Sequence, residues 1–129
     1  MVLRFAVPYL WLYRLFAFII MPRKNHKAAR LLFVNEAKKM NQKEFIKWFQ
    51  LTAEINPILR KFRAEELQIP TLYIMGSQDY MFLLSIKNIV INHSSSSILV
   101  EIQNSGHVVN VENALVFNKE TLDFIQKLK

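Results

Sequence analysis

Glycine occurs only twice in the 129 residues, at positions 76 and 106, and this scarcity restricts the turns that the chain can make. Loops that cradle phosphate groups need glycines close together, because the backbone must approach the ligand in conformations that other residues resist. The chain therefore has no Gly-rich phosphate loop. Gly76 instead closes the short apolar run Thr71–Met75, and Gly106 lies in a polar loop after a second apolar run, Ile98–Ile102. Each run is typical of a fully buried strand.

The second half of the chain alternates strands with helices, which predicts an α/β fold. Phe82 to Ile91 is a helix candidate between the two runs, and a final helix carries its apolar side chains on one face: Leu115, Leu122, Ile125 and Leu128. This order predicts two parallel strands joined by a right-handed crossover. Parallel sheets are normally buried on both faces and paired at their edges. We therefore expect either an unusual cover of helices or further strands from another polypeptide.

The first half is helical in pattern, and the composition changes near residue 66. Asn41 with Glu44 three residues later resembles a capping box, which predicts the start of a helix. Asn56-Pro57 places a capping residue before a proline, and this pair predicts the start of another short helix. The chain is long enough for one ordinary domain and too short for two.

The net charge of +7 is concentrated in the helical half. Residues 1–63 hold thirteen Lys and Arg against three Glu, whereas residues 64–129 hold four Lys against seven acidic side chains. A basic surface can bind nucleic acid. These charges recur at helical spacing between apolar residues, however, as they do on a solvated helix face. Because neither a zinc finger nor an RNP motif accompanies them, we expect no nucleic-acid partner.

Residues 2–21 are almost continuously apolar and long enough to suggest a transmembrane helix. Arg4, Pro8 and Arg14 lie inside this stretch and argue against a helix embedded in lipid. No small-residue cleavage site supports a signal peptide, while the basic residues after the stretch would suit a helix at a membrane surface. We favour a helix that packs on a core or partner surface. With no cysteine and hence no disulfide, the chain is expected to be cytoplasmic.

Asp79 and His107 are the two candidate site residues. They follow the two predicted strands, and the carboxyl ends of adjacent parallel strands meet at the edge where open α/β sheets place their sites. Each residue also has a local alternative: Asp79 can cap the next helix through an Asx turn, and His107 can be a loop histidine bonded to nearby backbone groups. Of the other histidines, His93 fits a loop and His26 fits a solvated basic helix face.

The segments around these two residues carry a resemblance to a known family. They are Ile69 to Asp79 (IPTLYIMGSQD), Asn104 to His107 (NSGH), Glu112, and the helix from Phe117 to Phe124. Residues 67–129 resemble the last third of an α/β-hydrolase, a β-α-β-α part of its core, and residues 1–66 resemble the helical lid that such enzymes insert before it. The resemblance implies that Asp79 is the acid of a catalytic triad and that His107 is its general base.

The nucleophile of that family is missing. It lies in Gly-x-Ser-x-Gly on a tight turn from a strand to a helix, and two glycines thirty residues apart cannot form this motif. The resemblance therefore implies the C-terminal portion of a serine ester or acyl hydrolase that is inactive alone. An aromatic lid favours an apolar ester or acyl substrate, turned over only when a partner completes the site. Triad hydrolysis implies neither a metal nor an organic cofactor.

Two further functions stay open. The chain can be a non-catalytic interaction or oligomerisation protein derived from the hydrolase fold, a homo-oligomer or a partner chain covering the open sheet edge. It can also be a small protein that associates with membrane surfaces through residues 1–30. Asp79 and His107 favour the hydrolase, whereas the glycine count argues against catalysis by the chain alone.

Overall fold

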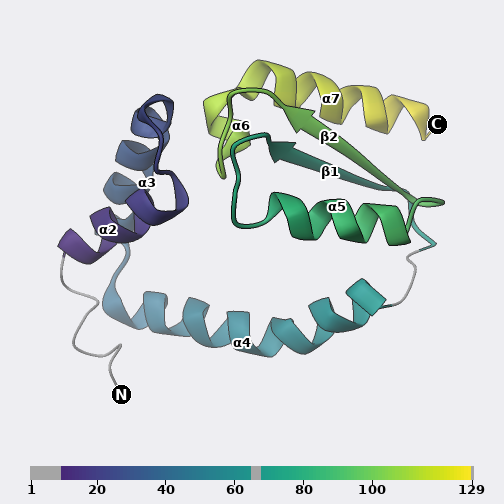
Figure 1. The fold of residues 1–129 in the computed structure, drawn as a ribbon. Coiled ribbons are helices and arrows are strands. Elements are labelled where there is room, and N and C mark those ends of the chain that lie inside the picture. Colours follow the sequence, from purple (N-terminus) through teal and green to yellow (C-terminus); the bar gives the residue numbers. More distant parts are fainter. Residues whose placement is uncertain (1–9, 65–67, 129) are drawn as a thin grey trace.

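A pair of helices forms the first part of the molecule. The computed structural model describes residues 10–64 and 68–128. Figure 1 shows the first two long helices side by side at one end of the molecule. The elements of this part are α2 (Leu10–Ile20), the 3-10 turn η1 (Lys24–His26) and α3 (Lys27–Lys39). None of the helices in the described ranges has the length and apolar character needed to cross a membrane.

An apolar core lies between α2 and α3. Its buried side chains are Ala17, Ile20, Met21, Ala29 and Val34, with Phe33 and Val108 packed against them. Arg30 closes the connection between the two helices, because its guanidinium donates to the carbonyl oxygens of Met21 and Arg23. The small side chains Ala17 and Ala29 in this core let the two helices approach closely.

The next element, α4 (Gln42–Ala64), is one continuous helix, so the separate start predicted at Asn56-Pro57 is wrong. Its beginning follows the prediction, since the backbone N–H of Glu44 donates to Oδ1 of Asn41 at 3.0 Å. Pro57 removes one N–H donor, and Ala53, whose carbonyl loses that donor, is exposed to water. The helix therefore continues through the proline and curves along its length (Figure 1).

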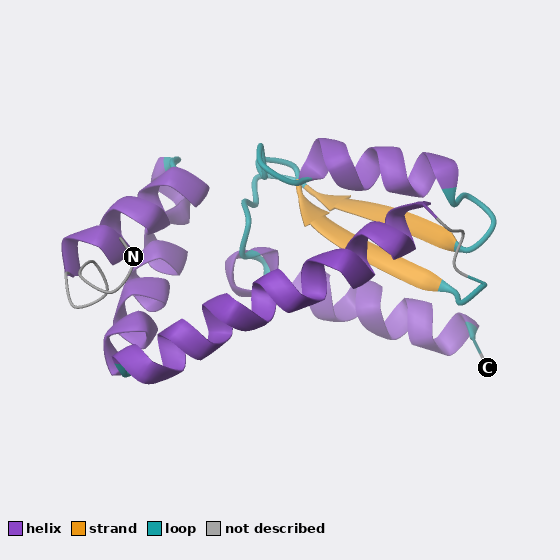
Figure 2. Ribbon diagram, turned by 90° about the horizontal axis from the view of Figure 1, so that it is seen from below, coloured by secondary structure: helices purple, strands orange, loops and turns teal. Residues whose placement is uncertain are grey.

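The second part is an α/β unit built around two parallel strands, which gives a mixed α/β fold that is mostly helical. The register runs from Thr71 opposite Ser97 to Gly76 opposite Ile102. Figures 1 and 2 show α5 on one face of the sheet and α7 on the other. Both strands and their parallel pairing confirm the predictions. The elements are β1 (Thr71–Gly76), α5 (Leu83–Asn92), β2 (Ser97–Ile102), α6 (Val109–Glu112) and α7 (Ala114–Lys127).

Each strand has one unpaired edge, because the sheet contains two strands within the described residues. The backbone N–H groups of Thr71 and Ser77 donate toward the β2 side of the sheet, at 2.7 and 2.9 Å. Hydrogen-bonding groups alternate sides along a strand, so Leu72 and Ile74 direct theirs to the open edge of β1. The sequence predicted fully buried strands, and this is wrong for β1, which is only half-buried apart from Gly76 because its open edge has no neighbouring strand in the described residues. Further strands from another polypeptide therefore stay a prediction.

The apolar face predicted for the last helix is exposed in α7. Leu115 is 87% exposed and Leu122 is 57% exposed. The half-buried residues of the helix lie on a different face and include Phe117 and Phe124. Because α7 is apolar on two faces, its periodicity alone could not show which face meets the sheet.

Candidate active site

Asp79 lies in the turn that follows β1 and is 2% exposed. Its backbone N–H donates to the carbonyl of Gly76 at 3.0 Å, which tightens the turn. Its Oδ1 accepts hydrogen bonds from the N–H groups of Met81 and Phe82, at 3.2 and 3.1 Å. These are donors at the beginning of α5, so the local capping role expected for this residue is present. The second carboxylate oxygen remains available for another partner.

That partner is His107, in the loop that follows β2. Nδ1 of His107 lies 2.9 Å from Oδ2 of Asp79. The Asp79 side chain is 3% exposed, whereas the His107 side chain is 37% exposed. One ring edge therefore meets the buried carboxylate while the imidazole reaches the surface. The ring of Phe82, with its centroid 5.0 Å away, packs against the imidazole.

The contact with a carboxylate fixes the roles of the two imidazole nitrogens. A carboxylate only accepts hydrogen bonds, so Nδ1 of His107 donates and carries the ring proton. Nε2 then has a free lone pair, and no residue in the described ranges bonds to it. An oriented imidazole of this kind can accept a proton from a hydroxyl group or from water.

The two loops meet because both glycines lie at the point of contact. A Cβ on Gly76 would stand 2.2 Å from the carbonyl oxygen of Gly106, so no larger residue fits there. The N–H of Gln78 donates to the carbonyl of Ser105 at 2.9 Å. Asn104 adopts φ 57°, a left-handed conformation that asparagine tolerates better than most residues. These contacts fix the loops that carry Asp79 and His107 against each other.

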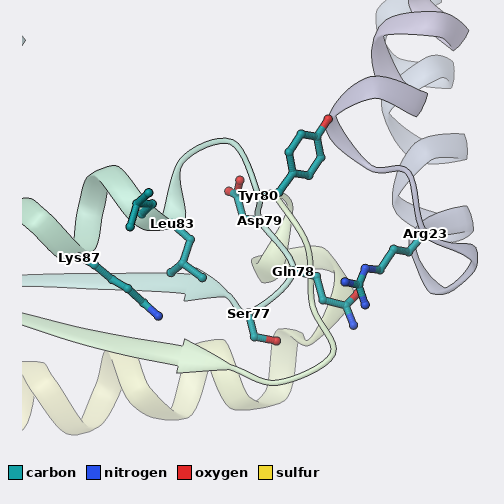
Figure 3. Close-up of a pocket in the computed structure, with 8 residues that line it drawn as sticks. Arg23, Ser77, Gln78, Asp79, Tyr80, Leu83 and Lys87 are labelled. Carbon is teal, nitrogen blue, oxygen red and sulfur yellow. The ribbon is translucent and has the colours of Figure 1, made fainter.

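A shallow hollow of about 230 Å³ opens beside Asp79. Figure 3 shows that its wall combines residues of the β1 turn with α5 and with the connection between α2 and α3. Arg23 and Lys87 give this wall two cationic groups, and Lys87 is paired with Glu101 at 2.7 Å. His107 does not line the hollow. Within the described ranges, no three His, Asp or Glu side chains gather as metal ligands would.

His26 corrects a prediction, because it is fully buried instead of lying on a solvated helix face. Its Nε2 lies 2.9 Å from Oε1 of Gln78 and 3.8 Å from Oε2 of Glu112. Sequence reasoning missed this residue because both partners are far along the chain and no motif surrounds it. His93 is also buried, at the end of α5.

Comparison with known proteins gave no match to this chain among family models, curated proteins or solved structures. The arrangement that can be described is a buried carboxylate, an oriented and partly exposed imidazole, and two interlocked loops at the carboxyl ends of parallel strands. Such an arrangement can supply an acid and a base, and within the described ranges no hydroxyl group bonds to His107.

Proposed function

We propose that this chain provides the acid and base of an α/β-hydrolase-type serine ester or acyl hydrolase. The observation that carries the proposal is the 2.9 Å contact between Nδ1 of His107 and Oδ2 of Asp79. A buried aspartate that orients a surface imidazole is the pairing that activates a hydroxyl nucleophile. Its place at the carboxyl ends of two parallel strands is also where sites of open α/β sheets lie.

In this function, His107 acts as the proton shuttle and Asp79 stays ionised. Nε2 accepts the proton of a serine hydroxyl as its oxygen attacks the acyl carbon, and it returns the proton to the leaving group. Asp79 holds the ring in the tautomer with hydrogen on Nδ1 and stabilises the imidazolium. Exposed aromatic side chains on α2, among them Trp11, Phe16 and Phe18, favour an apolar substrate.

The serine of this site comes from outside these 129 residues. Two serines lie in the site loops, and both are engaged locally: Oγ of Ser77 accepts the N–H of Asn104, and the hydroxyl of Ser105 donates to the carbonyl of Gln103. Neither bonds to His107. A partner strand beside β1 would bring a further loop to the same edge of the sheet, since the open side of β1 has backbone groups to receive it.

The test uses a fluorophosphonate probe, which reacts with activated serine hydroxyls. The full chain is isolated from its cells together with bound polypeptides and then exposed to the probe. We expect a labelled serine on a bound polypeptide, and we expect labelling to be lost in His107→Ala. Asp79→Asn should slow labelling by about 10,000-fold at neutral pH, because the imidazole takes the wrong tautomer.

Matched controls are His93→Ala and Asp123→Asn, which alter a histidine and an aspartate outside the pair. Both should keep the labelling. Labelling that persists in His107→Ala, or no labelled polypeptide at all, contradicts the proposal. Ester turnover by the pure chain that disappears in His107→Ala would also contradict it, because the nucleophile would then lie within this chain.

A non-catalytic interaction protein is the second candidate, and the exposed surface favours it. Large apolar side chains are exposed in both parts of the described chain: Trp11 on α2 is 58% exposed and Leu115 on α7 is 87% exposed. Large exposed apolar patches mark interaction sites. Sedimentation velocity from nanomolar to micromolar chain should show association, with itself or with an added partner. A monomer at every concentration, with the probe labelling described above, would leave only the hydrolase.

A further inference from the structure

The Asp79 turn is held on both sides by the helical segment, defined here as residues 10–40. On one side of Asp79, Oε1 of Gln78 lies 2.9 Å from Nε2 of His26. On the other side, the hydroxyl of Tyr80 donates to the carbonyl oxygen of Ile19. The turn that carries the acid is therefore bonded to α2 and to η1. The bonded residues are 52 and 61 positions apart in the sequence, so both hydrogen bonds are tertiary contacts. They exist only while the helical segment packs on the α/β unit.

The His107 loop is held in the same way. Gly106, immediately before His107, packs so closely on His26 that an added Cβ would lie 2.6 Å from Cε1 of that ring. Val108, immediately after His107, packs on the buried core between α2 and α3. The N–H of Gly106 also donates to Oε2 of Glu112 at 2.5 Å. The base is therefore carried by a loop whose two sides rest on the helical segment.

The His26 side chain contacts both loops, as the neighbouring Asn25 side chain also does, and the tautomer of His26 can be worked out. The carbonyl of Asn104 can only accept, so the atom of Asn25 that lies 2.8 Å from it is the donor Nδ2. The same Nδ2 lies 3.1 Å from Gln78, which makes that atom of Gln78 the acceptor Oε1. Nε2 of His26 must then donate to Oε1. A neutral His26 therefore keeps its ring proton on Nε2.

We propose that His26 is a positioning residue that sets the contact between Asp79 and His107. This proposal rests on the proposed function, because positioning matters only where the pair does chemistry. The ring fixes Gln78 by a hydrogen bond and Gly106 by van der Waals contact, and each of these residues precedes one member of the pair. His26 is fully buried, so it cannot move aside into solvent. Docking of the helical segment thereby assembles the acid–base pair.

The test observes the His107 ring by NMR in the full chain, which requires no nucleophile. In the unaltered chain we expect the Nδ1–H tautomer and a slowly exchanging Nδ1 proton. His26→Phe keeps a ring against Gly106 and removes the hydrogen bond to Gln78, whereas His26→Ala removes both. We expect partial loss of the slow proton in the first variant and complete loss in the second, with far-UV circular dichroism retained.

The matched control is His93→Ala, which removes a buried histidine at the opposite end of the sheet. It should lower the unfolding midpoint without changing the His107 signals. Unchanged His107 signals in both His26 variants overturn the positioning role. If the variants fail to fold, hydrogen exchange of the unaltered chain in low denaturant decides. The Nδ1 proton should exchange together with the amides of residues 24–40, and its survival after those amides have exchanged overturns the proposal.

This readout separates the two proposals. If fluorophosphonate labelling fails but the His26 variants change the His107 Nδ1 proton, the hydrolase function is wrong and the coupling between the segment and the pair is retained. If labelling succeeds but the His26 variants leave the His107 Nδ1 proton unchanged, only the positioning role is wrong.

Discussion

The two carboxylate oxygens of Asp79 have separate partners, and substitutions can separate them. Oδ1 accepts from the N–H groups before α5, and Oδ2 meets Nδ1 of His107. An alanine loses both partners. An asparagine can keep its oxygen toward the α5 donors, but its amide group then faces a nitrogen that also donates.

We therefore expect Asp79→Asn to cost less stability than Asp79→Ala, which should lose about 1–3 kcal/mol because buried donors are left unpaired. Both should move the ring proton of His107 from Nδ1 to Nε2. Urea unfolding measures the first effect and ¹⁵N shifts of the ring measure the second. Asp123→Asn, at a half-buried position of α7, should change neither property. Equal stability of the two Asp79 variants would show that the cap has no energetic role.

The contact between Gly106 and His26 predicts a double-mutant result. Gly106→Ala places a methyl group 2.6 Å from the His26 ring and should destabilise the chain by about 1–3 kcal/mol, as overpacking does. In a His26→Ala background the space is open, so most of that cost should disappear. Urea unfolding of the four proteins gives the coupling energy.

Gly76→Ala is the matched control for that cycle. Its added methyl would meet the backbone of Ser105 and Gly106, which His26→Ala does not remove. Its cost should therefore be the same in both backgrounds. An additive result for Gly106→Ala would mean that the ring does not restrain the loop.

The site residues that could be predicted from the sequence are those that follow the two strands. Asp79 and His107 could be named because the segments around them resemble those of a known family, and parallel strands bring the carboxyl ends of these segments together. His26 could not be named, because its burial depends on how the helical segment docks and no local pattern encodes that arrangement. The catalytic role of the pair stays a prediction.

At the scale of elements, the continuity of α4 implies that Pro57 lowers the stability of the helix. Because the helix runs through it, Pro57→Ala should restore one backbone hydrogen bond and stabilise the chain by about 1–3 kcal/mol. The companion variant Asn56→Ala should be neutral or slightly stabilising. Were Asn56 the cap of a separate helix, the same change would cost about 0.5–2 kcal/mol. Thermal unfolding of both variants decides between one helix and two.

Short apolar runs were easier to assign to an element type than a helix with two apolar faces was to orient. The runs that became β1 and β2 are short, apolar and bounded by turns, so strand was the only economical interpretation. In α7 the helix was predictable, but its buried face was not, since apolar side chains occupy two sides. The break predicted at Asn56-Pro57 failed because a proline on an exposed helix bends it without ending it.

At the scale of the whole molecule, exposed apolar residues predict association. Leu115 and Leu122 lie one above the other on α7 and are both more than half exposed. If this face meets a second chain, Leu122→Lys should weaken association about tenfold or more, since burying a leucine is worth about 1.5–3 kcal/mol. Sedimentation equilibrium measures the change. Lys119→Glu, on the same helix but paired with Asp123 in the unaltered chain, distinguishes a charge effect from an apolar one.

The composition changes near residue 66, which suggests that the chain could be cut there into two fragments. The contacts of His26 predict how the second fragment would behave. A fragment containing only the strands and their helices keeps both Asp79 and His107. It loses the ring beneath Gly106 and the donor to Gln78. The alignment of this pair thus depends on residues outside the segment that carries Asp79 and His107. A shortened chain without His26, or a graft that replaces residues 10–40 by another helical segment, would keep both site residues and lose their alignment.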